Sequence, residues 1–133
     1  MLTEKDKIEQ FKREMRSVKY IEGRMQEIND ELIRLNRIMR EPKGIRYGEP
    51  MGNTPNYFDL MEQEDQLRAE YEALQARQSD VYDKLDKIKS SSEKAALIAL
   101  YVNRERYEDV ADKYFRSIRS MKYHIDEVIS KIV

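Results

Sequence analysis

Apolar residues recur at every third or fourth position along the N-terminal part of the chain, in a sequence in which 38% of the residues are charged. This spacing places the apolar side chains in one stripe along a helix. The stripe is too narrow for a helix buried in a thick core, so a second helix has to cover it. We therefore predict a long helix at about 4–40, with a stripe made of Ile8, Phe11, Met15, Val18, Ile21, Met25, Ile28, Leu32, Leu35 and Met39.

All three prolines and three of the four glycines fall within residues 41–56, which predicts an irregular linker. A second stripe follows and predicts a helix at about 57–89. Residues 1–40 carry ten basic and eight acidic side chains, whereas 57–89 carry five basic and nine acidic ones, so the two segments have opposite net charges. We predict that they pair as an antiparallel, coiled-coil hairpin, residues 1–89. The second stripe contains Leu60, Leu67, Tyr71, Leu74, Val81, Leu85 and Ile88.

Two polar residues, Glu64 and Gln78, interrupt the second stripe. They either face water where the first helix leaves the stripe uncovered, or set the register of a paired or self-associated bundle. Two helices alone leave a broad stripe partly uncovered, so we also expect a homo-oligomer that forms through the long helices.

The C-terminal segment, 90–133, begins with Ser90 and Glu93, which fit a capping box and predict the start of a new helix. Further along, apolar residues step by four and three from Tyr107 to Ile132, as they would in one continuous coiled-coil helix. A second interpretation divides this segment, because Ser117 can cap a separate helix that starts at Ile118.

Composition excludes several classes of function. The chain contains no cysteine and a single histidine, His124, which has no ligand-type neighbours at metal-binding spacing, so we expect no metal and no cofactor. The carboxylates of 57–89 are expected at solvated positions, and a thin hairpin offers no pocket for a general acid or base, so we expect no enzymatic activity. We predict an intracellular, cytoplasmic protein without a membrane partner, because no segment has the apolar length of a signal peptide or a membrane span. The net charge of −1 means that binding to nucleic acid would depend on local charge.

The stretch LYVNRERYEDVADKYFRSIRSMKYHIDEVI, 100–129, resembles region four of bacterial sigma factors. Tyr101 and Val102 match the end of an apolar helix, and 108–111 match a Glu-Glu-Ile-Ala helix. Ser117 matches the cap of the recognition helix, Ser120 and Met121 its Thr-Val, and 128–129 its terminal Ala-Leu. The whole layout resembles the short phage and prophage regulators of the ArpU and RinA type. The sequence departs from the pattern at Phe115, where glycine is usual, and at Arg116 and His124, where apolar residues are usual.

The resemblance favours two helices over one in 107–133, and it implies a three-helix helix-turn-helix domain at 90–133. The predicted fold is therefore all-α: a long hairpin followed by this domain. Residues 116–124 contain three basic residues and no acidic residue. Acidic residues would be the ones that stabilise the start of a helix here. We expect them to contact DNA phosphates and base edges. The predicted DNA-binding residues are Arg104, Arg106, Arg116, Ser117, Arg119, Ser120, Lys122 and Tyr123.

We therefore expect a sequence-specific regulator of transcription that binds double-stranded DNA. The resemblance implies phage or prophage origin and activation of late genes together with host RNA polymerase. Two alternatives remain: a small DNA-packaging subunit of the terminase type, and a coiled-coil adaptor that binds no DNA. The adaptor requires one continuous helix over 107–133.

Overall fold

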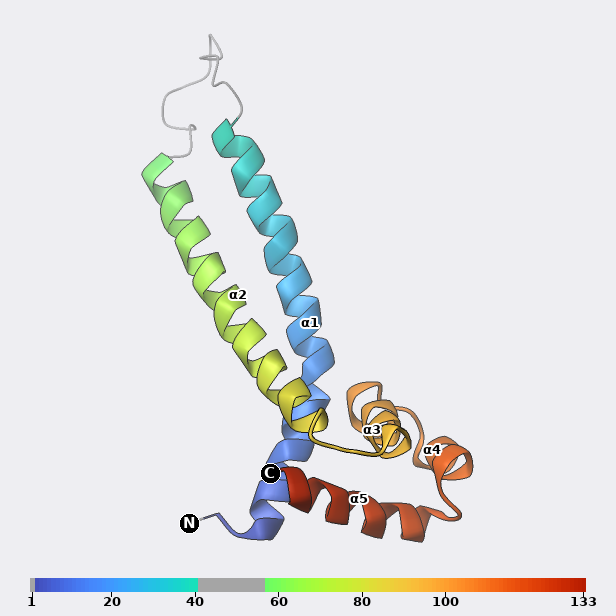
Figure 1. Ribbon diagram of the computed structural model, residues 1–133. Helices are drawn as coiled ribbons and strands as arrows, with labels where there is room; N and C mark the ends of the chain where they lie inside the picture. Colours follow the sequence, from blue (N-terminus) through green and yellow to red (C-terminus); the bar gives the residue numbers. More distant parts are fainter. Residues whose placement is uncertain (1, 41–56) are drawn as a thin grey trace. The chain divides into compact units, whose positions relative to one another are not determined.

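The computed structural model describes residues 2–40 and 57–133, and every regular element in these two segments is helical. The predicted all-α fold is therefore confirmed. The predicted linker, 41–56, lies outside the described residues. The elements follow in the order α1 (Glu4–Arg40), α2 (Tyr57–Leu85), α3 (Ser91–Leu97), the π-helical turn η2 (Ile98–Val102), α4 (Tyr107–Tyr114) and α5 (Ile118–Ile132) (Figure 1).

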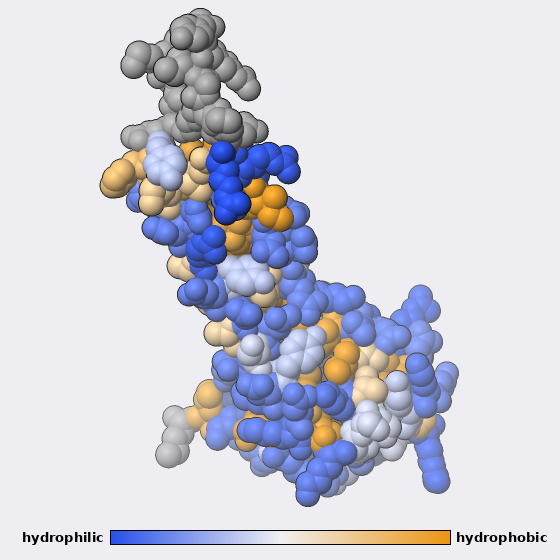
Figure 2. Space-filling view, turned by 45° about the horizontal axis from the view of Figure 1, so that its top comes forward, coloured by the Kyte–Doolittle hydropathy of each residue, from blue (hydrophilic) through white to orange (hydrophobic). Residues whose placement is uncertain are grey.

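The first helix begins at a reciprocal capping box. The backbone N–H of Asp6 donates to the Thr3 hydroxyl at 3.1 Å, and the Thr3 N–H donates to the Asp6 carboxylate at 3.2 Å. These bonds satisfy two amides that have no partner inside the helix. Every residue of the predicted stripe in α1 is buried or half-buried. On the face drawn in Figure 2 hydrophilic residues predominate, as the high content of charged residues requires.

The second helix ends earlier than the predicted boundary near residue 89. Its last residue is Leu85, and the backbone N–H groups of Lys87 and Ile88 then bond to carbonyls three residues back, both at 3.1 Å. This tighter pattern closes a helix end. The chain becomes extended at Ser90, whose hydroxyl accepts the Glu93 N–H and caps α3. α2 therefore stops early because the start of α3 requires a turn.

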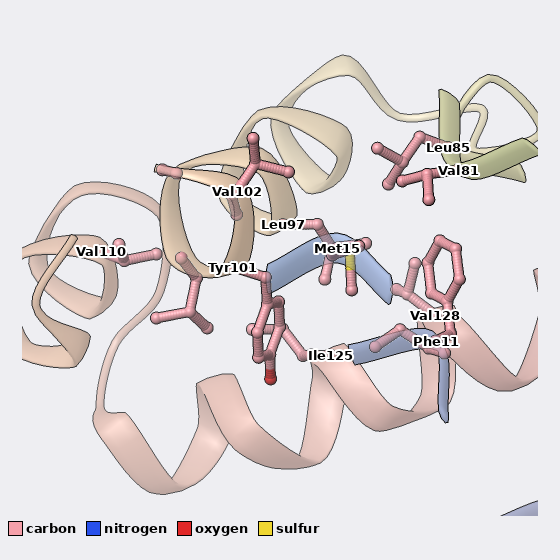
Figure 3. Close-up of a cluster of buried hydrophobic side chains, with 14 of the residues drawn as sticks. Phe11, Met15, Val81, Leu85, Leu97, Tyr101, Val102, Val110, Ile125 and Val128 are labelled. Atoms are coloured by element: carbon pink, nitrogen blue, oxygen red, sulfur yellow. The ribbon is translucent and has the colours of Figure 1, made fainter. Parts of the chain in front are cut away.

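The described chain forms two compact units. The first contains Met1–Glu22 and Ala76–Val133, and the second contains Gly23–Gln75. This division differs from the predicted boundary between 1–89 and 90–133. The reason is the core of the first unit, which combines side chains of α1 and α2 with those of the C-terminal helices (Figure 3). Its buried members from α1 and α2 are Phe11, Met15, Val18, Val81 and Leu85.

In the second unit, Ile28 and Leu35 of α1 and Leu60 and Leu74 of α2 are buried. An exposed ion pair joins the two helices there. The Arg24 guanidinium donates to both carboxylate oxygens of Glu70, at 2.7 and 3.0 Å. Hydrogen bonding to Glu70 raises the pKa of Arg24, and the same bond lowers the pKa of Glu70. Because the pair is in contact with solvent, it selects a register more than it adds stability.

The polar seam residue Gln78 has a partner on α1. Its amide donates to the Glu22 carboxylate at 3.1 Å, and the Tyr82 hydroxyl donates to the same oxygen at 3.4 Å. Burial, followed by the nearby charge of Glu22, raises the pKa of Tyr82. Glu64, the second polar seam residue, pairs with Arg68 on its own helix. Of the two interpretations, a role in register fits Gln78, whereas Glu64 has a local partner.

Lys12 links α1 to α5. Its ammonium lies 2.7 Å from the Asp126 carboxylate, and only 13% of its side chain is exposed. Burial alone would lower the pKa of Lys12, but the bond to Asp126 and nearby negative charge raise it above its ordinary value. Burial raises the pKa of Tyr101, and the charge of Asp126 adds to this effect. Asp126 therefore stabilises the protonated forms of two core-facing groups.

We predict that Asp126→Asn lowers the free energy of unfolding at neutral pH and flattens its decline at alkaline pH. Groups with raised pKa values keep their protons in the folded protein and lose them earlier when unfolded, so the wild type loses stability as the pH rises from about 10 upward. Urea unfolding across this range measures the effect. Glu127→Gln is the matched control, because Glu127 is exposed beside it. Equal pH dependence in wild type and Asp126→Asn would contradict this role.

Candidate nucleic-acid interface

Residues 107–133 form two helices. α4 ends at Tyr114 and α5 starts at Ile118. Phe115, with φ −137° and ψ 173°, and Ser117, with φ −156° and ψ 162°, are both extended. The alternative prediction of one continuous helix is therefore wrong. Because Phe115 is extended, the turn does not need the glycine that the sigma-like pattern has at this position.

Ser117 caps the second helix as predicted. Its hydroxyl accepts the backbone N–H of Ser120 at 3.1 Å, and its carbonyl accepts the N–H of Met121 at 3.0 Å. The Ser117 hydroxyl oxygen is therefore occupied in fixing the start of α5. Of the predicted DNA-binding residues, this one has a structural role that explains its presence.

Phe115 and His124 connect the turn to the start of α3. Phe115 packs against the core cluster, and its ring meets the His124 ring edge-on, with the ring centres 5.7 Å apart. His124 Nε2 lies 2.8 Å from the Glu93 carboxylate. Of the two hydrogen bonds of the capping box at Ser90, the one from the Glu93 N–H to the Ser90 hydroxyl is formed. The Glu93 carboxylate contacts His124. The histidine has a structural place, at the junction of three elements.

α5 has two distinct faces along its first half. Met121 and Ile125 are buried in the core, whereas every other residue of 116–123 is exposed. The exposed set contains Arg116, Arg119 and Lys122 together with Ser120 and Tyr123, the last with 76% of its surface exposed. No acidic residue lies in the first turn of α5. The next acidic residue is Asp126, which is paired with Lys12. The first half of α5 therefore presents positive charge to solvent.

A shallow groove lies between the start of α4 and the first turns of α5. It has a volume of about 440 Å³ and is lined by Arg106, Tyr107, Glu108, Ile118 and Lys122. The Lys122 ammonium lies 5.4 Å from the centre of the Tyr107 ring. Tyr107 and Ile118 are 41% and 37% exposed, although the periodic spacing placed both in the apolar stripe. The apolar spacing did not predict their exposure, because each is the first residue of its helix, α4 or α5, where the stripe is not yet covered.

Arg104 does not line this groove. It has a positive φ of 53°, a left-handed conformation that is uncommon for arginine. Its guanidinium donates to the backbone carbonyl of Arg16 in α1 at 3.2 Å. The predicted DNA-binding set is therefore divided. Arg106 and Lys122 share the groove, Arg116, Arg119, Ser120 and Tyr123 are exposed around the start of α5, and Arg104 is attached to α1.

No protein-family model, curated protein or solved structure matches this chain. Among the described residues, no group of three or more histidine, cysteine, aspartate or glutamate residues is arranged to hold a metal ion. None of the helices in 2–40 and 57–133 is long and apolar enough to cross a membrane.

We predict that Ser117→Ala lowers the free energy of unfolding by about 1 kcal/mol, because the Ser120 amide loses its partner at the helix start. Urea unfolding measures the change. Ser91→Ala is the control, since Ser91 is an exposed serine in the first turn of α3 and not its cap. If the two substitutions had the same effect, the hydroxyl of Ser117 would not be stabilising α5.

A second prediction concerns Arg104. Arg104→Ala removes the hydrogen bond to Arg16 and keeps the strained backbone, whereas Arg104→Gly removes the bond and relieves the strain. We expect the glycine variant to be more stable than the alanine variant by about 1 kcal/mol, the reverse of the usual order. Chemical unfolding of both variants tests this. An alanine variant at least as stable as the glycine variant would show that the left-handed backbone is not under strain.

Proposed function

We propose that the chain binds double-stranded DNA through the exposed basic half of α5, as a regulator of transcription. The observation that carries this proposal is the two-faced start of α5, with Met121 and Ile125 in the core and Arg116, Arg119 and Lys122 in solvent. A short helix, a tight turn and a second helix with a free polar face are the parts of a helix-turn-helix motif. α4 would be its first helix and α5 its recognition helix.

The electrostatics of α5 support an anionic partner. Its first turn contains Arg119 and no acidic residue, and Arg116 and Lys122 flank this turn, so the side chains add to the partial positive charge of the free backbone N–H groups. This arrangement is unfavourable for an isolated helix and favourable for binding phosphate. The chain as a whole has a net charge of −1, so attraction to DNA would be confined to this region.

Specific roles follow from side-chain chemistry. Arg119 has a planar guanidinium that can donate two hydrogen bonds to a guanine edge in the major groove. Lys122 and Arg106, on the rim of the groove beside Tyr107, fit phosphates. Ser120 and Tyr123 can donate hydroxyl hydrogen bonds to the DNA backbone. Arg104 contributes through its attachment to α1 and is a positioning residue in this proposal.

The regulatory part of the proposal depends on the resemblance to sigma region four and to phage regulators of the ArpU and RinA type. It assigns to the chain the activation of late genes together with host RNA polymerase. The long helices α1 and α2 would supply the dimer contacts, which would present two copies of α5 to two half-sites on the DNA.

The test is a salt series of fluorescence anisotropy with a labelled duplex of random sequence. We expect wild-type affinity to fall as salt rises, with a log–log slope of about −0.9 for each phosphate neutralised. The variant Arg116→Glu/Arg119→Glu/Lys122→Glu should lose binding while it keeps its helicity. A matched control, Arg13→Glu/Lys19→Glu/Arg37→Glu, changes the net charge equally at exposed positions of α1 and should bind more tightly than the α5 variant.

Two results would refute the proposal. One is a wild-type protein that does not bind the duplex even at low salt. The other is an equal loss of binding in the α5 variant and in the α1 control, because a general effect of net charge would then explain the affinity. In either case the helical adaptor that binds no DNA becomes the better description.

A further inference from the structure

A second groove lies at the other end of α5, beside the connection between α2 and α3. It has a volume of about 390 Å³. Its apolar residues, Ile88, Val128 and Ile132, belong to the core cluster or pack against it. Its charged residues are Lys87, Lys89, Lys131 and Glu93. The groove therefore combines an apolar floor with a rim that is mostly positive.

The positive charge of the rim is largely uncompensated. The Glu93 carboxylate is the one negative group among the lining residues and lies 2.8 Å from His124 Nε2. The Asp86 carboxylate, next to Lys87 in the sequence, pairs with Lys94. Lys131 has one partner, Glu127 on its own helix, at a long distance of 3.9 Å. Within 2–40 and 57–133, neither Lys87 nor Lys89 has a carboxylate within ion-pair distance. All three lysines are exposed.

We propose that this groove binds an acidic, amphipathic helical segment of a partner protein. Such a segment carries apolar residues at every third or fourth position, which would contact Ile88, Val128 and Ile132. Its carboxylates would lie between the three lysines. Charge complementarity of this kind speeds association and fixes the orientation of the partner.

DNA is a poorer fit for this groove, although it is also anionic. Phosphates need positive charge and donors but gain nothing from an apolar floor. The α5 residues that line the groove also lie 8 to 12 residues beyond Ser120, or about 12–18 Å along the helix, away from its basic start. A partner in this groove would leave the first half of α5 free, so the inference does not depend on DNA binding.

A second copy of the chain is the other competing occupant. Residues 57–75 carry six acidic residues and one basic residue, and Phe58 and Met61 there are 77% and 47% exposed. Self-association through this groove is therefore tested separately, by sedimentation of the wild type and of the groove variant, Lys87→Glu/Lys89→Glu/Lys131→Glu. A wild-type oligomer that the groove variant converts to monomer would overturn the proposal in favour of a second copy.

The main experiment selects peptides of about 12 residues, some three helical turns, from a random display library on the immobilised full chain. Enriched peptides should be acidic, with apolar residues at helical spacing. Labelled synthetic copies are then titrated by anisotropy. Lys87→Glu/Lys89→Glu/Lys131→Glu should weaken binding roughly tenfold to a hundredfold, through the loss of three charge pairs and added repulsion. Arg13→Glu/Lys19→Glu/Arg37→Glu is the matched control and should bind within about threefold of wild type, since none of these exposed residues lines the groove and salt screens charges outside a site.

Ile88→Asp tests the apolar floor. It should weaken the peptide by roughly tenfold, the value of losing a small buried apolar contact. Circular dichroism checks that each variant is folded, and if Ile88→Asp unfolds, the lysine variant and peptides with alanine at the apolar positions decide the question. Alanine peptides that bind as well as the parents would overturn the proposal, because charge alone would then explain binding.

Three further outcomes would overturn it: no enrichment of acidic amphipathic peptides, equal binding to the groove variant and wild type, or a loss of duplex DNA binding in the groove variant as large as in the α5 variant. The last result would make the groove part of a DNA surface. A groove variant that still binds DNA but not the peptide separates this inference from the proposed function.

Discussion

The packing of the start of α1 against the C-terminal helices is the interaction on which the first unit depends. α3 and α4 have seven and eight residues, too few to be stable helices by themselves. They are held because Phe11 and Met15, with 1% and 0% of their surface exposed, enter the same core as Leu97 of α3 and Val110 of α4 (Figure 3). Burying side chains of this size contributes about 1.5–3 kcal/mol each. A fragment of residues 90–133 alone would therefore lack the side chains of α1 and α2 that complete the core beneath the candidate interface.

The π-helical turn η2 adapts the short third helix to this core. Ala99, Leu100, Tyr101 and Val102 are four consecutive buried residues, more than one face of a regular α-helix can bury. A π-helical turn is wider and changes the direction of successive side chains. Tyr101 in this turn has the Lys12 ammonium and the Arg16 guanidinium 5.9 and 5.3 Å from its ring centre. Two residues after η2, Arg104 has a left-handed backbone and donates to the Arg16 carbonyl of α1. This part of the chain is therefore connected to α1 both through Tyr101 and through Arg104.

The periodic spacing of apolar residues predicted the two long helices, because such spacing is sufficient to identify an amphipathic helix. The stripes of α1 and α2 are two long, regular signals, and the limits of α1 agree with its stripe. Periodicity could not decide whether the chain breaks at Phe115, because three non-helical residues happen to preserve the four-and-three spacing. The cap at Ser117 was the one local signal of that break. The spacing also placed Tyr107 and Ile118 in the buried stripe, although each is the exposed first residue of its helix. Nothing in the sequence indicates that Arg104 bonds to a carbonyl far away in the chain.

At the start of α5, the residues that stabilise the helix differ from the residues that the proposed function requires. The cap at Ser117 and the buried Met121 and Ile125 stabilise it, whereas basic residues near a helix start oppose its dipole by about 0.3–1 kcal/mol each. Glutamates at 116 and 119 would interact favourably with that dipole. A variant with these changes should therefore stay folded, and its loss of DNA binding would reflect the removed charges. The basic residues are thus best explained by a partner, because the helix would be more stable without them.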